Sequence, residues 1–141
     1  MLDEKLLPKY GAKVAFIHRD LPLGRHNWAR PAAMVARWVQ EQDPRLGITF
    51  RRELLAEQEH ITPATLKPWV AEFARRNKLS EQGIAAALTD PRMGALVDRD
   101  IQVAAARGVD KIPAVYVAGQ SFVETIVYDD LARVIDQALA R

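Results

Sequence analysis

Few residues of this chain have the types and spacing that catalysis requires. The 141 residues include no cysteine, so they supply no thiolate nucleophile, no disulfide and no cysteine ligand for zinc. His18 and His26 flank a loop that also carries Asp20, which is a partial ligand set for a metal ion. The third histidine, His60, lies far along the chain and no fourth ligand is evident. We therefore expect no metal site, and we expect the histidines to form loop hydrogen bonds or to be exposed.

Other catalytic patterns are also missing. No G-x-S-x-G occurs, and Ser80 and Ser121 fall at a predicted helix start and in a predicted hairpin, so a serine hydrolase is not supported. Neither a P-loop nor G-x-G-x-x-G is present. Asp129-Asp130 fits the first turn of a helix, where acids favour the dipole, and Asp98 and Asp100 are interpreted as a solvated helix face. The sequence thus predicts no catalytic residue and no cofactor.

Composition narrows the class of protein. Twenty Lys and Arg against eighteen Asp and Glu give a net charge of only +2, without the clustered cations that nucleic-acid binding needs. Hydrophobic residues at 49% and charged residues at 27% are values of a folded globular protein, and the length suits one domain over residues 1–141. No apolar run is long enough to span a membrane, and the N-terminus has no apolar signal core. We expect a chain that stays where it is made, which as written is the cytoplasm.

The segment "GVDKIPAVYVAGQ", Gly108 to Gln120, presents an unusual strand start. Pro113 opens the apolar run Ala114 to Val117, and Ala118-Gly119 follows as a turn. Because proline cannot donate a hydrogen bond to a sheet, it belongs at the first residue of a strand or at a sheet edge. The sequence predicts a strand over 114–117, a tight turn, and a second strand over 121–124.

The stretch before this segment is mostly helical. A short strand is predicted over 13–18, where β-branched and aromatic residues follow Gly11. Residues 27–88 then have helical spacing, with Asn27 as the expected cap of the first helix. A later helix opens with Thr62 as its cap and Pro63 in its first turn, and Pro68 would kink or divide it.

Two more helices complete the predicted order. One begins after the cap Asp90 and ends at Gly108, and the last covers residues 128–141 with Leu131, Val134 and Ile135 on one apolar stripe. At the N-terminus, Leu2, Leu6 and Leu7 have helical spacing and predict a short helix that stops at Gly11. The order is therefore helix, strand, helical block, strand, strand, helix. A strand, a long crossover and a second strand normally form a parallel connection, so the prediction is a mixed α/β sheet with a helical insertion over 27–88.

In this order the pieces resemble the DsbA-like thiol-disulfide oxidoreductases, which have a thioredoxin-like fold with inserted helices. "KVAFIHRDLPLGRHN" resembles a core strand of that family and the loop after it, and "FRRELLAEQEHITPATLKPWVAEFA" resembles its insertion helices. "DIQVAAARGVDKIPAVYVAGQSFVETIVYDDLARVIDQAL" resembles its helix, cis-proline strand, hairpin and closing helix. The resemblance covers nearly the whole chain.

The resemblance implies that the Ile112–Pro113 bond is cis and that Ile112 and Pro113 bind an extended peptide or protein substrate. It also implies that a first core strand and a Cys-x-x-Cys motif are missing, since "MLDEKLLPKYG" resembles the helix just after the second cysteine. We expect either a truncated family member without redox activity or a non-catalytic peptide-binding or scaffolding module. A glutathione-using isomerase of the same fold is a weaker alternative. Relatives are often exported.

A missing central strand would leave two unpaired strand edges, which native proteins rarely tolerate. Two outcomes are open. The edges pair across a subunit boundary to form a homo-oligomer, or the sheet collapses so that residues 13–18 pair directly with residues 114–117.

Overall fold

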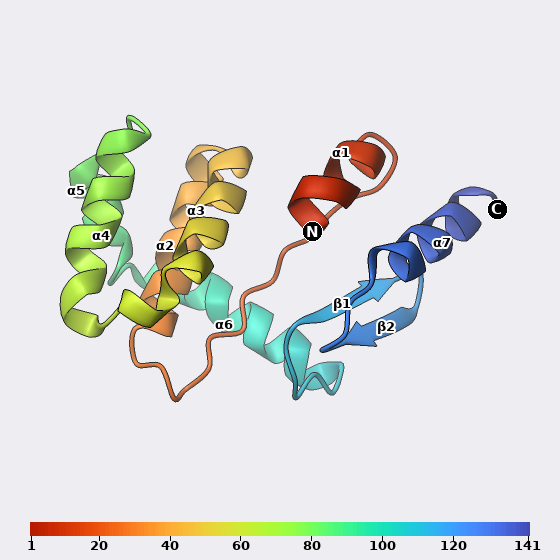
Figure 1. Cartoon of the computed structure of the whole chain (residues 1–141). Coiled ribbons are helices and arrows are strands. Elements are labelled where there is room, and N and C mark those ends of the chain that lie inside the picture. The colour runs from red at the N-terminus through yellow and green to blue at the C-terminus, as the bar shows by residue number, and fades with distance from the viewer. The chain divides into compact units, whose positions relative to one another are not determined.

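The computed structural model describes all 141 residues, which divide into two units (Figure 1). The terminal unit joins residues 1–18 to residues 104–141, and the helical unit is residues 19–103. Each unit has its own apolar core. The helical insertion predicted over 27–88 lies within the helical unit.

The helical unit contains five α-helices and one short 3₁₀ turn. They are α2 (Ala29–Gln42), α3 (Pro44–Ala56), η2 (Gln58–His60), α4 (Pro63–Arg76), α5 (Glu81–Ala87) and α6 (Pro91–Ala106). The last three residues of α6 belong to the terminal unit. None of the helices of the chain is long and apolar enough to cross a lipid bilayer.

Helix starts in this unit follow the capping signals of the sequence, with one exception. The Thr62 hydroxyl accepts a hydrogen bond from the third helical N–H of α4, and the Ser80 hydroxyl does the same for α5. The Asp90 carboxylate accepts from the N–H of the second residue of α6. The prediction for Asn27 was wrong, because Trp28 occupies the capping position of α2 and no side chain caps that helix. The Asn27 side chain therefore makes no capping bond.

The core of the helical unit is built from the apolar stripes of its helices. Phe50 and Phe73 pack edge to face with ring centroids 5.0 Å apart, and the Trp69 ring contacts both. The three tryptophans are partly buried and pack against this core. Pro68 lies inside α4 without dividing it.

The terminal unit contains the two ends of the chain. Its elements are a π-helical turn η1 (Leu2–Leu6), α1 (Leu7–Tyr10), β1 (Ala114–Val117), β2 (Gln120–Val123) and α7 (Tyr128–Leu139). Leu6 and Tyr10 pack against α7, and the Tyr10 hydroxyl donates to Asp136 Oδ1 at 2.9 Å. One face of the sheet, with Val115 and Val117, packs against the same core.

The hairpin is confirmed, with the second strand one residue earlier than predicted. Ala118 and Gly119 form the turn with φ of 47° and 83°. Positive φ at both central residues matches the twist of a two-residue hairpin, which explains why the sequence places glycine there. Ala114 pairs with Val123 and Val117 with Gln120 in an antiparallel register.

The strand predicted over 13–18 is not formed, and the mixed sheet is not seen. Residues 11–14 turn after α1, where the N–H groups of Lys13 and Val14 both donate to the Tyr10 carbonyl, and residues 15–20 have no regular structure. Direct pairing of 13–18 with β1 is therefore wrong, because β2 is the only strand beside β1. Strand propensity depends on packing and on a neighbouring strand, and residues 13–18 have no such neighbour. Ile17, which would be buried in a core strand, is 74% exposed. The architecture is helix-rich α/β with a small antiparallel sheet.

Candidate functional site

The candidate site begins where the chain enters β1. The peptide bond between Ile112 and Pro113 is cis, both residues are exposed, and Ile112 is 44% exposed. The Pro113 carbonyl accepts a hydrogen bond of 2.8 Å from the Glu124 N–H. This bond extends the hairpin by one pair beyond β1 and fixes the backbone of Pro113 relative to β2.

The same bond determines which backbone groups of β1 point away from β2. In an antiparallel ladder, hydrogen-bonded and non-hydrogen-bonded pairs alternate. Since Pro113 bonds to Glu124, Val115 and Val117 also face β2, whereas the N–H and C=O groups of Ala114 and Tyr116 face outward. No backbone partner exists for these four groups, because β1 has no second neighbour. β1 therefore presents an open edge, which we define as the outward backbone of Ala114 and Tyr116.

The sheet face opposite the core is apolar and partly exposed. Tyr116 and Val123, which point to this face, are 40% and 41% exposed. The Arg107 guanidinium lies 5.4 Å from the centroid of the Tyr116 ring. Lys111 and Glu124 form an ion pair of 3.5 Å beside the start of the strand. The open edge thus borders apolar side chains and charges of both signs.

Asp20, one of the residues considered for metal binding, pairs with arginines. No group of three or more histidine or acidic side chains is placed to hold a metal ion. Both oxygens of Asp20 accept from the Arg51 guanidinium, at 2.9 and 3.0 Å, and Arg37 Nε lies 3.4 Å from the same carboxylate. Asp20 is therefore part of an ion-pair network.

The sequence analysis did not predict that Asp20 pairs with Arg51. Its prediction that Asp100 lies on a solvated helix face was wrong. Asp100 on α6 is only 1% exposed; its carboxylate accepts from Arg19 at 3.0 Å, from the Asp20 N–H at 2.9 Å, and from Arg37. We call Arg19, Asp20, Arg37, Arg51 and Asp100 the ion network. Each of its three arginines pairs with at least one of its two aspartates, although the buried Arg37 Nε forms no hydrogen bond. The network therefore holds the loop at 19–20 against α2, α3 and α6.

A signal for the buried acid was present in the sequence. Asp100 follows Met93 and Val97 at helical spacings of seven and three, and both of those residues are buried. An acid on the apolar stripe of a helix indicates a buried ion pair. Asp98, by contrast, is exposed as expected and pairs with Arg30 at 2.6 Å, which lowers the pKa of the Asp98 carboxyl through the Arg30 hydrogen bond.

Comparison with known proteins supplies the family. Comparisons with curated proteins and with solved structures gave no match. A family model described as thioredoxin matches residues 2–137, which is nearly the whole chain and includes both units. Pro113, both strands and all but the last two residues of α7 lie within the match. The chain therefore belongs to the thioredoxin family.

Proposed function

We propose that this chain is a DsbA-like member of the thioredoxin family that binds an extended polypeptide segment at the open edge of β1. Its order of elements supports the DsbA-like assignment, because the helical unit interrupts the sequence of the terminal unit between residues 18 and 104. The single observation that carries the binding proposal is the set of four outward backbone groups on Ala114 and Tyr116, directly after the exposed Ile112–Pro113.

Strand addition is the mode of recognition that fits this edge. An extended peptide beside β1 would exchange up to four backbone hydrogen bonds with it. At a net value of about 1 kcal/mol each, these bonds alone correspond to a dissociation constant of roughly millimolar. Tighter binding requires apolar ligand side chains that cover Tyr116 and Val123 on the exposed face. The preferred ligand is therefore an extended segment with alternating apolar residues.

Disulfide chemistry would need thiols from elsewhere. The 141 residues contain no cysteine, so the chain alone is expected to show neither disulfide oxidase nor reductase activity. In a thiol-disulfide reaction, its contribution would be to hold the substrate backbone at Ile112 and Pro113. A role in thiol-disulfide exchange would therefore use the same open edge of β1 as peptide binding.

The test compares two substitutions at one residue. Tyr116→Pro removes the outward N–H, whereas the matched control Tyr116→Ala removes the same ring and keeps the N–H. Both leave intact the Val115 and Val117 bonds to β2, since proline is tolerated where the N–H faces away from the ladder. Fluorescence polarisation with a library of labelled extended peptides measures binding. We expect Tyr116→Pro to bind at least about fivefold more weakly than Tyr116→Ala, the loss of one backbone bond, and Ile112→Asp also to bind more weakly than the wild type.

Equal affinities for the two Tyr116 variants would contradict strand addition. A second copy of the chain is the competing occupant of the edge, as two unpaired edges can form a homodimer. Light scattering over a range of concentrations detects this outcome. A dimer that Tyr116→Pro dissociates, in a protein that binds none of the peptides, would replace the peptide proposal with self-association.

A further inference from the structure

The terminal unit contains an apolar segment that lies in solvent, between the turn after α1 and the start of the helical unit. Residues 15–18 have no regular structure, and all four are exposed. Phe16 is 41% exposed, and Ile17, at 74%, is the most exposed of the large apolar side chains of the chain. Consecutive apolar side chains in solvent are typical of an interaction surface.

The backbone of this segment is also unpaired. The turn after α1 ends at Val14, whose N–H donates to the Tyr10 carbonyl. None of the N–H and C=O groups of Ala15, Phe16 and Ile17 has a backbone partner within the chain. We call these three residues the exposed segment. Its composition favours a strand, and its backbone groups are available to a strand edge.

The spacing of the exposed segment matches that of the open edge of β1. The outward groups of β1 belong to Ala114 and Tyr116, which are two positions apart. In an antiparallel pairing, Ala15 would exchange both of its backbone bonds with Tyr116, and Ile17 would do so with Ala114. Phe16 would then point to the opposite face of the sheet.

This register also covers exposed apolar surface. Val123 pairs with Ala114 on β2, so Ile17 would extend that row across the outer face of the sheet. The Ile17 side chain would lie diagonally beside the Tyr116 ring. Both Val123 and Tyr116 are about as exposed as Phe16 in the single chain. The pairing would thus bury apolar side chains of the segment and of the edge together.

The segment that fits the edge must come from a second copy of the chain. Within one copy the pairing is not made, because β2 is the only strand beside β1. An unpaired edge is a template for a strand from another chain. In a twofold symmetric dimer each copy gives one exposed segment and receives one, so both contacts form in the same assembly.

We propose that the exposed segment of a second copy occupies the open edge of β1, and that this self-association regulates peptide binding. The inference rests on the proposed function, because both use the same edge. Four backbone bonds give a dissociation constant of roughly millimolar, and burial of Ile17 should lower it about tenfold, to roughly 0.1 mM. The edge is then free in dilute protein, and copies of the chain exclude other peptides from it in concentrated protein.

The first experiment uses the synthetic peptide KVAFIHR, which is residues 13–19 with blocked ends and a fluorophore, and measures its binding by fluorescence polarisation. N-methylation at Ile17 removes an N–H that would face β1. N-methylation at Phe16 is the matched control, because that N–H would face away. We expect the Ile17-methylated peptide to bind at least about fivefold more weakly than the Phe16-methylated one, the loss of one backbone bond.

The second experiment follows the full chain by light scattering, from about tenfold below to about tenfold above the expected dissociation constant. The average mass should rise with concentration. Ile17→Asp should weaken this association at least about tenfold, because the apolar contact is lost and a charge enters the sheet face. Leu55→Asp is the control, since Leu55 is 62% exposed in the helical unit, and it should leave the association unchanged.

Equal affinities of the two N-methylated peptides, or equal masses of the Ile17→Asp and Leu55→Asp variants, would overturn this inference. If other extended peptides bind in a manner that depends on the Tyr116 N–H and KVAFIHR does not, the inference fails and the proposed function stands. If the Tyr116→Pro and Tyr116→Ala variants bind every peptide equally, the proposed function fails as well.

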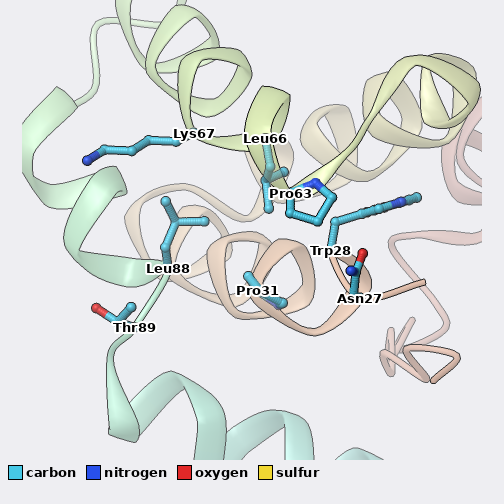
Figure 2. Close-up of a pocket in the computed structure, with 8 residues that line it drawn as sticks. All are labelled: Asn27, Trp28, Pro31, Pro63, Leu66, Lys67, Leu88 and Thr89. Atoms are coloured by element: carbon cyan, nitrogen blue, oxygen red, sulfur yellow. The ribbon is translucent and has the colours of Figure 1, made fainter. Parts of the chain in front are cut away.

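An apolar peptide has a further place to bind, in the helical unit. A depression of about 280 Å³ lies where the starts of α2 and α4 meet the end of α5, and its apolar lining includes Pro31, Pro63, Leu66 and Leu88 (Figure 2). Binding of KVAFIHR there would depend neither on the Tyr116 N–H nor on which residue is methylated. That result would also count against the proposal.

Discussion

Removal of the Asp100 carboxylate is expected to destabilise the helical unit strongly. Asp100 is buried and accepts hydrogen bonds from Arg19, Arg37 and the Asp20 N–H. Asp100→Ala leaves these donors without their acceptor. Breaking a buried ion pair from one side costs about 3–5 kcal/mol. Arg19 is exposed enough to rehydrate and Arg37 keeps Asp20 as a partner, so we expect the lower end, about 3 kcal/mol.

Urea unfolding followed by tryptophan fluorescence measures this change, because all three tryptophans belong to the helical unit. With an m-value of about 2 kcal/mol/M, a loss of 3 kcal/mol moves the midpoint down by roughly 1.5 M. Asp98→Ala is the matched control on the same helix, since Asp98 is exposed and pairs with a single arginine. Midpoints of Asp100→Ala and Asp98→Ala that agree within error would refute the assignment of a stabilising role to the ion network.

Two further predictions concern packing and pH. A Cβ at Gly47 would lie 2.8 Å from Gln40 Cβ and 2.9 Å from Gln40 Cα. The cost of overpacking, about 1–3 kcal/mol, should exceed the gain in helix propensity of about 1 kcal/mol, so Gly47→Ala should lower the thermal midpoint, and a raised midpoint would contradict the close contact. Gly94→Ala is the control and should not lower the midpoint, because its nearest atom lies 3.4 Å away on the flexible Arg30 side chain. The lowered pKa of Asp98 means that its pairing with Arg30 stabilises the fold above the unfolded pKa near 3.8, and that this contribution is lost as the pH falls through the lower folded pKa. Acid titrations should therefore show a small stability advantage of the wild type over Asp98→Asn that shrinks as the pH falls below 3.8. An advantage that grows with acidity would contradict this sign.

Local signals in the sequence were sufficient for most helices and for the hairpin. Thr62 and Ser80 cap helices because a hydroxyl oxygen and a backbone N–H three residues later are neighbours in any helix start. The turn at Ala118-Gly119 likewise depends only on the conformations available to two residues. Asn27 failed as a cap because Trp28, one residue later, takes the capping position.

Features that depend on distant residues could not be predicted in the same way. Residues 13–18 have the composition of a strand, but a strand exists only where another strand supplies its hydrogen bonds, and none lies beside them. The outward backbone groups of β1 could not be predicted without the register of β1 and β2, because a shift of one residue would exchange the inward and outward groups. The pairing of Asp20 with Arg51 joins residues 31 positions apart, and spacing along one helix gives no information about such a contact.

The ion network has a consequence for the modularity of the chain. Residues 19–20 begin the helical unit, and Asp100, to which they bind, lies one helical turn before its last residue, Val103. The two ends of an 85-residue segment are thereby fastened to each other by groups inside that segment. Segments with adjacent ends are those that insert into a host domain without disturbing it. The three arginines and two aspartates of the ion network thus hold the two ends of the helical unit together, as is expected of a segment that interrupts the sequence of the smaller terminal unit.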